Sequence, residues 1–331
     1  MSDSPGHVPV LLTRVTELLA PVAARQDAVI VDATVGLGGH ALALLQAHER
    51  LQVIGLDRDP EALRIARERL TPYGDRIRLV HTRFDALAEV LEEATGTGVD
   101  GVLFDLGVSS MQLDETERGF SYSKDTALDM RMDSTASLTA EHVVNTYSRG
   151  ELTRVLRAYG EERFASRVSA AIVRERARSP ITSSAALAEL VRSAIPAATR
   201  RTGGHPAKRT FQGLRIEVNG ELAALEGALP QAIEALRPGG RLVAISYHSL
   251  EDRIVKRALV RATEDSTPLD LPVLLPQAQP RLRMLTRGAE LPTAEELDIN
   301  PRSASAKLRA AERVEFGAPQ SGSRRLTRGA A

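Results

Sequence analysis

The first third of the chain alternates between short apolar runs and amphipathic segments. The apolar runs, which predict buried strands, are residues 28–33, 51–57, 77–82 and 101–107. Segments with apolar residues at helical spacing lie between them, as in ALALLQAHE and FDALAEVLEEA. The segment DPEALRIARERL, residues 59–70, has Asp59 as a helix N-cap and Pro60 at the first helical position. Repeated strand–helix units of this kind predict a parallel sheet with helices on both faces.

The alternation stops near residue 113 and gives way to helical spacing alone. The clearest amphipathic segments there are ELTRVLRAYG, FASRVSAAIVRERAR and SSAALAELVRSAI. A further helix is expected over residues 213–236, followed by PGG as a turn and by a strand over residues 241–247. The segments PRLRMLTRG and SAKLRAAERVEF then predict a closing pair of strands.

These patterns predict two domains and a tail. Residues 1–112 and 214–316 are expected to form one discontinuous α/β domain, and residues 113–213 a helical insertion. The tail, residues 317–331, is rich in Gly, Ser and Arg and is expected to be disordered. No apolar run approaches the roughly 20 residues of a membrane helix. The N-terminus also lacks a basic, apolar leader pattern, so the cytoplasm is the expected location.

Composition narrows the chemistry that the chain can perform. Cysteine is absent, which excludes disulfides, thiolate metal sites, a cysteine nucleophile and the zinc deaminases. The formal net charge is +0, but the charge is unevenly distributed. Residues 85–141 carry 13 acidic and 3 basic side chains, whereas residues 151–215 carry 5 acidic and 13 basic ones. The basic excess is nearly all arginine, which suits a phosphate backbone and equally a solvated helix face.

A glycine cluster in VDATVGLGGH, residues 31–40, joins the first predicted strand to a helix. Strand, glycine turn and helix N-terminus together form a common site for nucleotide-like ligands. The segment GLGGHA, residues 36–41, fits the loose pattern G-x-G-x-x-G/A, and Asp57 stands where a ribose-binding acid is expected. This pattern fits NAD and S-adenosylmethionine equally. A P-loop is poorly supported, because no G-K-[ST] closes the turn.

Three further positions favour S-adenosylmethionine. Asp32 ends the first strand, where a carboxylate would face the methionine ammonium of a cationic cofactor and would repel a pyrophosphate. Phe84 follows the third strand at a position suited to flank an adenine. Asp105 ends the fourth strand, at the edge where an open α/β sheet meets its substrate. Helix capping and turn formation are the alternative roles of Asp32 and Asp105.

Ten sequence motifs occur in order along the chain. They are HVPVLL, DATVGLGGHA, GLDRDPEA, DLGVSSMQLD, RGFSY, LDMRMD, HPAKRTFQGLRIEVNGEL, LRPGGRL, ISYHSLEDR and NPRSASAKLRAAE. Over residues 7–313 the sequence resembles the bacterial small-subunit (16S) ribosomal RNA cytosine-N4 methyltransferase family. The resemblance implies a class I, Rossmann-like S-adenosylmethionine-dependent methyltransferase fold with an inserted all-helical domain. It also implies a cytidine in the decoding region as substrate, and often a homodimer.

The resemblance further implies cofactor contacts at particular positions. These positions are Gly38, Gly39, His40, Asp57, Phe84, Asp105 and Gln112. The Asp/Asn-Pro-Pro-aromatic turn of many amino-methyltransferases is replaced here by DLGV, residues 105–108. This departure leaves open which groups activate the N4 amine.

Three residues are candidates for the catalytic chemistry. The cytosine N4 amine is a poor nucleophile because its lone pair is delocalised into the ring, so hydrogen-bond acceptors must help to localise it. Asp105 is the best candidate acceptor, although the resemblance supports it more firmly as a cofactor contact. Tyr247 is placed to stack on an extruded base, and His248 to hydrogen-bond the base or a phosphate. The alternative is a packed tyrosine and a helix capped by Ser249, with Asp252 at its third position.

The segment HPAKRTFQGLR combines cations with an aromatic ring, a mixture that suits single-stranded RNA. The residues that provide it are Lys208, Arg209, Phe211 and Arg215. A buried Phe211 beneath a basic surface is the alternative. Where the insertion begins, Arg131 and Asp133 are candidates for a structural ion pair or for substrate contact.

Three functions compete for these features. The first is an N4-cytosine methyltransferase whose partner is 16S rRNA in the small ribosomal subunit. The second is an NAD-dependent oxidoreductase, which would share the glycine turn and Asp57 but leaves the arginine-rich insertion unexplained. The third is a non-catalytic ribosome-assembly factor that retains the fold. No metal site is expected in any of the three.

Overall fold

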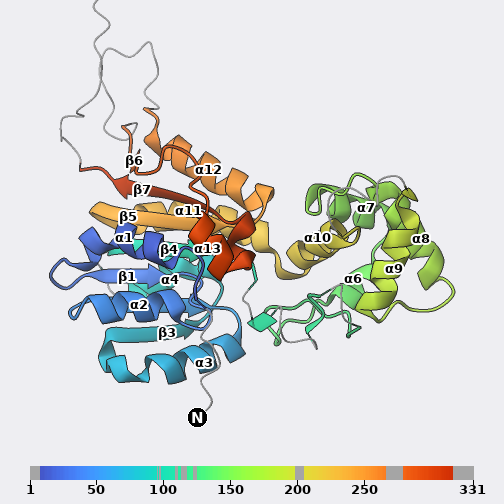
Figure 1. Cartoon of the computed structure of the whole chain (residues 1–331), viewed down its shortest axis with the longest axis horizontal. Helices are drawn as coiled ribbons and strands as arrows, with labels where there is room; N and C mark the ends of the chain where they lie inside the picture. Colours follow the sequence, from blue (N-terminus) through green and yellow to red (C-terminus); the bar gives the residue numbers. More distant parts are fainter. Residues whose placement is uncertain are drawn as a thin grey trace, which may run out of the picture.

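One seven-stranded sheet forms the centre of the molecule in the computed structural model (Figure 1). The structure describes residues 8–94, 96, 98–108, 111–112, 118–121, 125–197, 205–265 and 279–315. The strands are β1 (Val29–Asp32), β2 (Gln52–Asp57), β3 (Ile77–His81), β4 (Val99–Asp105), β5 (Leu236–Ser246), β6 (Leu282–Met284) and β7 (Lys307–Arg313). Their order in the sheet is β3-β2-β1-β4-β5-β7-β6.

The direction of the strands defines where a ligand can bind. The pairings among β1 to β5 are parallel, whereas β7 is antiparallel to both β5 and β6. The chain proceeds from β1 to one side through β2 and β3, and returns to the other side of β1 with β4 and β5. Such a switch in direction leaves a crevice at the carboxyl ends of the strands, here between β1 and β4.

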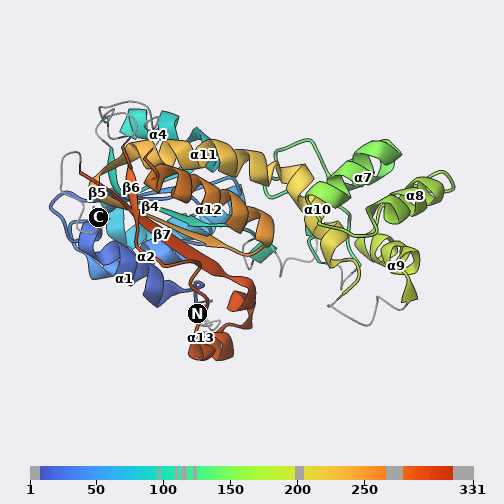
Figure 2. The same cartoon turned by 90° about the horizontal axis from the view of Figure 1, so that it is seen from above.

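Helices cover both faces of this sheet, as the sequence predicts (Figure 2). One face packs against α1 (Leu12–Ala23), α2 (Gly39–Ala47) and α3 (Pro60–Leu70). The other face packs against α4 (Leu87–Ala94), α11 (Glu221–Ala235) and α12 (Ser249–Thr263). Leu103 and Phe104, adjacent in β4, belong to the two different core clusters. This alternation is what a strand that is buried on both sides requires.

A second, all-helical unit lies beside the sheet domain (Figures 1 and 2). Its helices are α6 (Ala140–Thr146), α7 (Arg149–Ala158), α8 (Ala165–Arg176), α9 (Ser184–Ala194) and α10 (Lys208–Asn219). A separate core cluster that includes Val143, Leu156, Ile172 and Leu187 holds them together. The short elements α13 (Ala294–Ile299) and η6 (Pro301–Ser305) precede β7. None of the helices in the described ranges reaches the length and apolarity that a bilayer crossing requires.

The helical unit continues beyond residue 213. Phe211, Leu214 and Val218 of α10 all belong to its core cluster. Gly220 then ends α10 in a left-handed conformation with φ 59°, which glycine adopts without steric cost. The single helix expected over residues 213–236 is therefore wrong, because Gly220 divides it into α10 and α11. We propose Gly220 as the boundary between the two domains.

The remaining predictions of strands agree with the structure, with one local difference. The four strands of the first third and the closing pair are confirmed within a few residues at their ends. The PGG segment, expected as a turn, lies inside β5 as a bulge: Leu236 pairs with Val99 and Arg241 with Gly101. The tail from residue 317 and residues 113–117 at the start of the predicted insertion lie outside the described residues.

Candidate active site

A cavity of about 620 Å³ opens at the carboxyl ends of the parallel strands, where the sheet domain meets α10. This volume lies within the range of about 300–1,000 Å³ that is usual for ligand pockets. Most of the predicted site residues line it, namely Gly39, His40, Asp57, Phe84, Asp105, Gln112, Lys208, Phe211, Arg215, Tyr247 and His248. Gly38 and Arg209 lie outside the lining. The fold thus brings together residues that are far apart in the sequence.

The glycine turn leads the chain from β1 into α2. Gly36 (φ 51°) and Gly38 (φ 80°) have left-handed conformations that favour glycine. A Cβ on Gly38 would lie 3.0 Å from Leu70 Cδ1, so this glycine lets the turn pack on α3. A Cβ on Gly39 would overlap the ring of Pro9. Gly38 therefore supports the turn from behind, whereas Gly39 forms part of the cavity wall.

Asp57 ends β2 and faces the glycine turn. Its Oδ2 accepts a 2.8 Å hydrogen bond from Gly36 N, and its Oδ1 accepts one of 2.8 Å from Asp59 N. Burial raises the pKa of Asp57 to about 6, although these two backbone N–H groups oppose the rise. Each carboxylate oxygen can still accept a further hydrogen bond. Asp57 is therefore a fixed acceptor at the cavity surface.

Asp32 lies beneath the cavity rather than at its surface. Its side chain is buried, and it is not among the lining residues. Its Oδ1 accepts a 3.3 Å hydrogen bond from Thr34 N. Burial, together with the charges of Asp105 and Asp57, raises the pKa of Asp32 to about 8. Asp32 is therefore not placed for the expected direct contact with a cofactor, because it lies one layer below the cavity surface.

Phe84 stands in the cavity wall, in the short helix η2 (Phe84–Ala86) that follows β3. Its ring centroid lies 5.8 Å from that of Phe104, and the two rings are nearly perpendicular. Such edge-to-face contacts are favourable between aromatic rings. Because Phe104 is fully buried in the sheet core, this contact fixes the position of Phe84.

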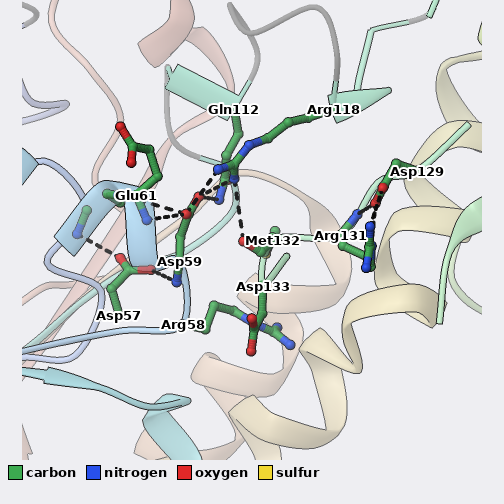
Figure 3. A network of polar contacts seen from close by, with 12 residues as sticks. Asp57, Arg58, Asp59, Glu61, Gln112, Arg118, Asp129, Arg131, Met132 and Asp133 are labelled. Atoms are coloured by element: carbon green, nitrogen blue, oxygen red, sulfur yellow. Dashed lines mark hydrogen bonds and ion pairs between the residues drawn. The ribbon is translucent and has the colours of Figure 1, made fainter. Parts of the chain in front are cut away.

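Asp59 joins the sheet domain to the segment that leads into the helical unit (Figure 3). Its Oδ1 caps α3 by accepting a hydrogen bond from Glu61 N, which confirms the predicted N-cap. Its Oδ2 accepts a 2.9 Å hydrogen bond from Gln112 Nε2, and Arg118 forms an ion pair with the same carboxylate. Gln112, a predicted cofactor contact, thus lines the cavity while its amide nitrogen is held by fully buried Asp59.

Arg58 holds the other connection of the helical unit. Its Nη1 donates a 2.8 Å hydrogen bond to the carbonyl oxygen of Asn219, at the end of α10. The Asn219 side chain in turn bonds Met130 O and Met132 N, each at 2.8 Å. The turn at residues 57–59 therefore contacts the cavity and both chain connections of the helical unit.

Asp105 and Tyr247 meet at the ends of the neighbouring strands β4 and β5. The Tyr247 hydroxyl donates a 2.8 Å hydrogen bond to Asp105 Oδ1. Burial, and after it the charge of Asp105, raises the pKa of Tyr247, so the phenol keeps its proton. His40 Nδ1 lies 3.7 Å from Asp105 Oδ2, and His40 Nε2 lies 3.1 Å from Val10 O. Because a carbonyl oxygen only accepts, Nε2 carries a proton.

His248 caps α12, a role that the alternative interpretation assigned to Ser249. His248 Nδ1 accepts a 3.3 Å hydrogen bond from Glu251 N, and Glu251 Oε2 accepts one of 3.1 Å from His248 N. Glu251, and not Asp252, is therefore the third residue of this capping box. Burial by itself would raise the pKa of Glu251, but His248 and the charge of Arg215 outweigh it and lower the pKa.

The four candidates for RNA contact lie at this junction in different settings. Lys208 is exposed and lines the cavity, whereas Arg209 is exposed and donates to a backbone carbonyl of the helical unit. Arg215 forms a 2.8 Å ion pair with Glu221, so its charge is compensated. Phe211 belongs to the core of the helical unit and also reaches the cavity lining.

The ion pair expected at the start of the insertion has a different partner. Arg131 pairs with Asp129 at 2.7 Å (Figure 3). Asp133 instead accepts a 2.6 Å hydrogen bond from Thr135. Neither Arg131 nor Asp133 lines the cavity. The pair is therefore a local feature of this segment.

Several cavity residues are missed by reasoning from the sequence. They include Pro9, Arg58, Glu221, Glu251 and Arg302. All of them fall inside the ten ordered motifs, so the motifs themselves are the signal that would have found them. In the described ranges, no group of three or more His, Asp and Glu side chains is arranged to bind a metal ion.

The cavity fits a cationic nucleoside ligand. Asp57 offers an acceptor for ribose hydroxyls, Phe84 an aromatic wall, and Asp105 a carboxylate at the sheet edge. An anionic pyrophosphate would be repelled by these acids. The seven-stranded sheet with its antiparallel β7, together with this cavity, defines a class I methyltransferase, and S-adenosylmethionine is its cofactor.

Comparison with known proteins gives the family. A model of the MraW methylase family matches residues 4–314, and the chain belongs to this family. Ribosomal RNA small subunit methyltransferase H of Saccharopolyspora erythraea is 61% identical over 309 residues, 93% of this chain and 94% of that protein. The protein of the same name from Thermobifida fusca is 61% identical over 313 residues, 95% of each chain. A solved rRNA methylase from Streptococcus thermophilus aligns with a TM-score of 0.42 at 12% identity, covering 94% of this chain and 100% of the other.

Proposed function

We propose that this chain transfers a methyl group from S-adenosylmethionine to the exocyclic N4 amine of a specific cytidine in the decoding region of 16S rRNA. One observation carries the proposal: a single cavity is lined by Asp57 and Asp105 of the sheet domain and by Lys208 and Phe211 of α10. A donor at the strand ends and a nucleotide beside the helical unit would meet there. The shared name of the curated relatives, ribosomal RNA small subunit methyltransferase H, supports this substrate class.

On the donor side, the residues present suit each part of the cofactor. Asp57 would accept hydrogen bonds from the ribose hydroxyls, and Phe84 would flank the adenine. The remaining contacts are proposed for Gly39, His40, Asp105 and Gln112, while Gly38 supports the turn behind them. When bound, S-adenosylmethionine supplies an electrophilic methyl group on a cationic sulfur.

On the acceptor side, we propose that Asp105 accepts a hydrogen bond from the N4 amine. The Tyr247 hydroxyl holds Asp105 Oδ1, which fixes the orientation of the carboxylate. An acceptor at the N–H group helps to localise the nitrogen lone pair toward the incoming methyl group. As N4 gains the methyl group, the methyl–sulfur bond would break and leave the neutral thioether S-adenosylhomocysteine. The nitrogen would then be cationic and its proton more acidic. Asp105 then accepts that proton, so no strong base is required.

The substrate nucleotide would be held from α10 and α12. Lys208 is an exposed cation in the cavity lining, and His248, the N-cap of α12, lines the same cavity. We propose Lys208 for a phosphate and His248 for the base or a phosphate. Phe211 would stack on a base through the part of its ring that reaches the cavity. Arg209 is proposed to add positive potential at the junction, whereas Arg215, which is paired with Glu221, is proposed only as part of the cavity wall.

Methylation of small ribosomal subunits in vitro tests the proposal. Subunits from a strain that lacks this enzyme are incubated with the protein and labelled S-adenosylmethionine, and the rRNA is then digested. We expect mass spectrometry to find N4-methylcytidine in one rRNA fragment. Methylation at another atom, such as C5, would contradict the proposal.

The two other functions make different predictions. An NAD-dependent oxidoreductase would bind NADH more tightly than S-adenosylhomocysteine, and membership of a methylase family gives it no support. A non-catalytic assembly factor would bind subunits without incorporating any methyl group. A homodimer and a cytoplasmic location are further proposals.

A further inference from the structure

Four cationic side chains share the outward face of α12. They follow one another at spacings that place them on one side of a helix. All four are exposed: Arg253, Lys256, Arg257 and Arg261. The opposite side of α12 packs into the sheet core through Val255 and Leu259. The cations therefore face solvent along about two turns of the helix.

Most of this positive charge has no counter-charge on the protein. Within the described residues, Lys256, Arg257 and Arg261 form no ion pair. Asp252, an acid in the first turn of the same helix, pairs instead with Arg309 of β7 at 2.7 Å. The face of α12 is thus basic in net terms.

Two exposed arginines on other helices, Arg64 and Arg192, show the ordinary pattern of a solvated helix. Arg64 of α3 pairs with Glu61 at 2.6 Å and with Glu68 at 2.5 Å along the same helix. Arg192 of α9 pairs with Glu189 at 2.6 Å. Such alternating charges suit water and need no partner. Lys256, Arg257 and Arg261 lack this compensation, unlike Arg64 and Arg192.

The basic face begins at the mouth of the cavity. Its first member, Arg253, is one turn from His248 in the cavity wall and pairs with Glu161 of the helical unit at 3.3 Å. Arg209 of α10 donates to the carbonyl oxygen of the same Glu161, and its neighbour Lys208 lines the cavity. Figure 2 shows one end of α12 directed toward α10. A basic path therefore runs from the cavity across the junction onto α12.

We propose that Arg253, Lys256, Arg257 and Arg261 on α12 bind the phosphate backbone of the RNA strand that flanks the target nucleotide. This inference rests on the proposed function, because it takes the substrate to be rRNA. Lysine and arginine supply the main contacts to phosphates, and these contacts fix register without reading sequence. In this arrangement the sheet domain holds the RNA together with the helical unit, and the cavity lies between the two contacts.

The test is the double variant Lys256→Glu with Arg257→Glu, assayed on small subunits from a strain lacking the enzyme. We expect KM for the subunits to rise about tenfold or more, because phosphate contacts dominate binding. The dependence of log K on log salt should become less steep by about 1.4 to 1.8, the value for two lost phosphate contacts. Affinity for S-adenosylhomocysteine and the melting temperature should remain those of the unmodified protein.

The matched control is Arg50→Glu with Arg67→Glu, which makes the same change of charge. Both residues are exposed, beside α2 and on α3, on the other face of the sheet. This variant should keep the KM and salt dependence of the unmodified protein. A wild-type KM in the α12 variant, or a raised KM with an unchanged salt slope, would overturn the proposal.

The same assay separates this inference from the proposed function. If the unmodified protein forms no N4-methylcytidine, the proposed reaction is rejected. Direct binding of the protein to subunits, followed over a range of salt concentrations, would still show whether the α12 face contacts phosphates. Salt-dependent binding that the α12 variant loses supports the inference, and binding that both variants keep overturns it.

Discussion

The acidic side chains on the two sides of the cavity are compensated in different ways. On the side of β1 and β2, Asp32 is buried and Asp57 is partly buried at the cavity surface, and within the described residues neither forms an ion pair. Burial raises their pKa values to about 8 and about 6. On the side of α12, Glu251 is as buried as Asp32, yet His248 and Arg215 lower its pKa.

This difference indicates which side of the cavity requires a cation from outside. A buried carboxylate is costly unless positive charge or hydrogen bonds stabilise it. The α12 side obtains that charge from the chain itself, through Arg215. The sheet side does not, and a sulfonium cofactor with its ammonium group would supply the charge there. Asp59 is the exception on the sheet side, because its ion pair with Arg118 compensates its negative charge. The same pair anchors the segment that leads into the helical unit to the sheet domain.

The largest effect is expected on the stability of the fold, when the ion pair between Asp59 and Arg118 is broken. In Arg118→Gln, Asp59 stays buried with the Gln112 amide and the first N–H groups of α3 as donors. Breaking a buried ion pair costs about 3–5 kcal/mol, and we expect about 3 kcal/mol because these hydrogen bonds remain. Chemical unfolding followed by circular dichroism measures the loss.

Arg131→Gln is the matched control for that variant. Arg131 and its partner Asp129 each have 26% of the side chain exposed, so this pair is screened by water. Its removal should cost about 1 kcal/mol or less. Equal losses of stability in the two variants would show that Asp59 and Arg118 do not form a special anchor.

Asp105→Asn should have the largest effect on the reaction itself. The amide has no charge and cannot take up the proton that leaves the N4 amine. We expect kcat in single-turnover methylation of small subunits to fall about 100-fold, or roughly 2.7 kcal/mol. Tyr247→Phe removes only the hydroxyl that orients Asp105, so its kcat should fall less, about tenfold. A larger loss in Tyr247→Phe than in Asp105→Asn would assign the chemistry to the phenol.

Asp57→Ala tests the sheet side of the comparison. The ribose hydroxyls would lose a charged acceptor, so affinity for S-adenosylhomocysteine should fall by about 2 kcal/mol, roughly 30-fold. Isothermal titration calorimetry measures this change. Asp85→Ala is a control near the same wall, because Asp85 pairs with Arg83 and is not part of the lining. An unchanged dissociation constant for Asp57→Ala would refute the ribose assignment.

The sheet and the glycine turn could be predicted because their causes are local in sequence. Strands buried on both faces read as unbroken apolar runs, as in residues 28–33 and 101–107. The spacing from the glycine turn to Asp57 follows from the length of one helix and one strand. The position of the cavity follows from the order of the strands.

What could not be predicted depends on contacts between distant segments. Asp59 reads as a helix cap, and nothing near it in the sequence indicates that Arg118 pairs with it. His248 rather than Ser249 caps α12, because the Ser249 hydroxyl donates to Glu161 in the helical unit. Gly220 lies within a pattern of helical spacing, and only its left-handed backbone shows where α10 ends.

The smallest effect, and the most direct test of the comparison, is the dependence of cofactor binding on pH. The pKa of Asp57 is raised to about 6 in the folded chain, above the value of about 3.9 for an unperturbed Asp. Protonated Asp57 would lose its charge as an acceptor, so affinity for S-adenosylhomocysteine should fall as the pH drops through about 6. The expected limit is about tenfold per pH unit, and Asp57→Asn should abolish this dependence.

Stability of the ligand-free chain should respond in the opposite direction. Because the folded state binds this proton more tightly than the unfolded state, the contribution of Asp57 is fully present below about pH 4 and is lost as the pH rises to about 6. Raising the pH over this window therefore strengthens binding while it removes stability. We would measure the free energy of unfolding of the unmodified protein and of Asp57→Asn at several pH values. The difference between the two isolates the contribution of Asp57 to stability. If the affinity for S-adenosylhomocysteine and the stability contribution of Asp57 both rise with pH, Asp57 is not an uncompensated carboxylate. The contrast between the two sides of the cavity would then fail.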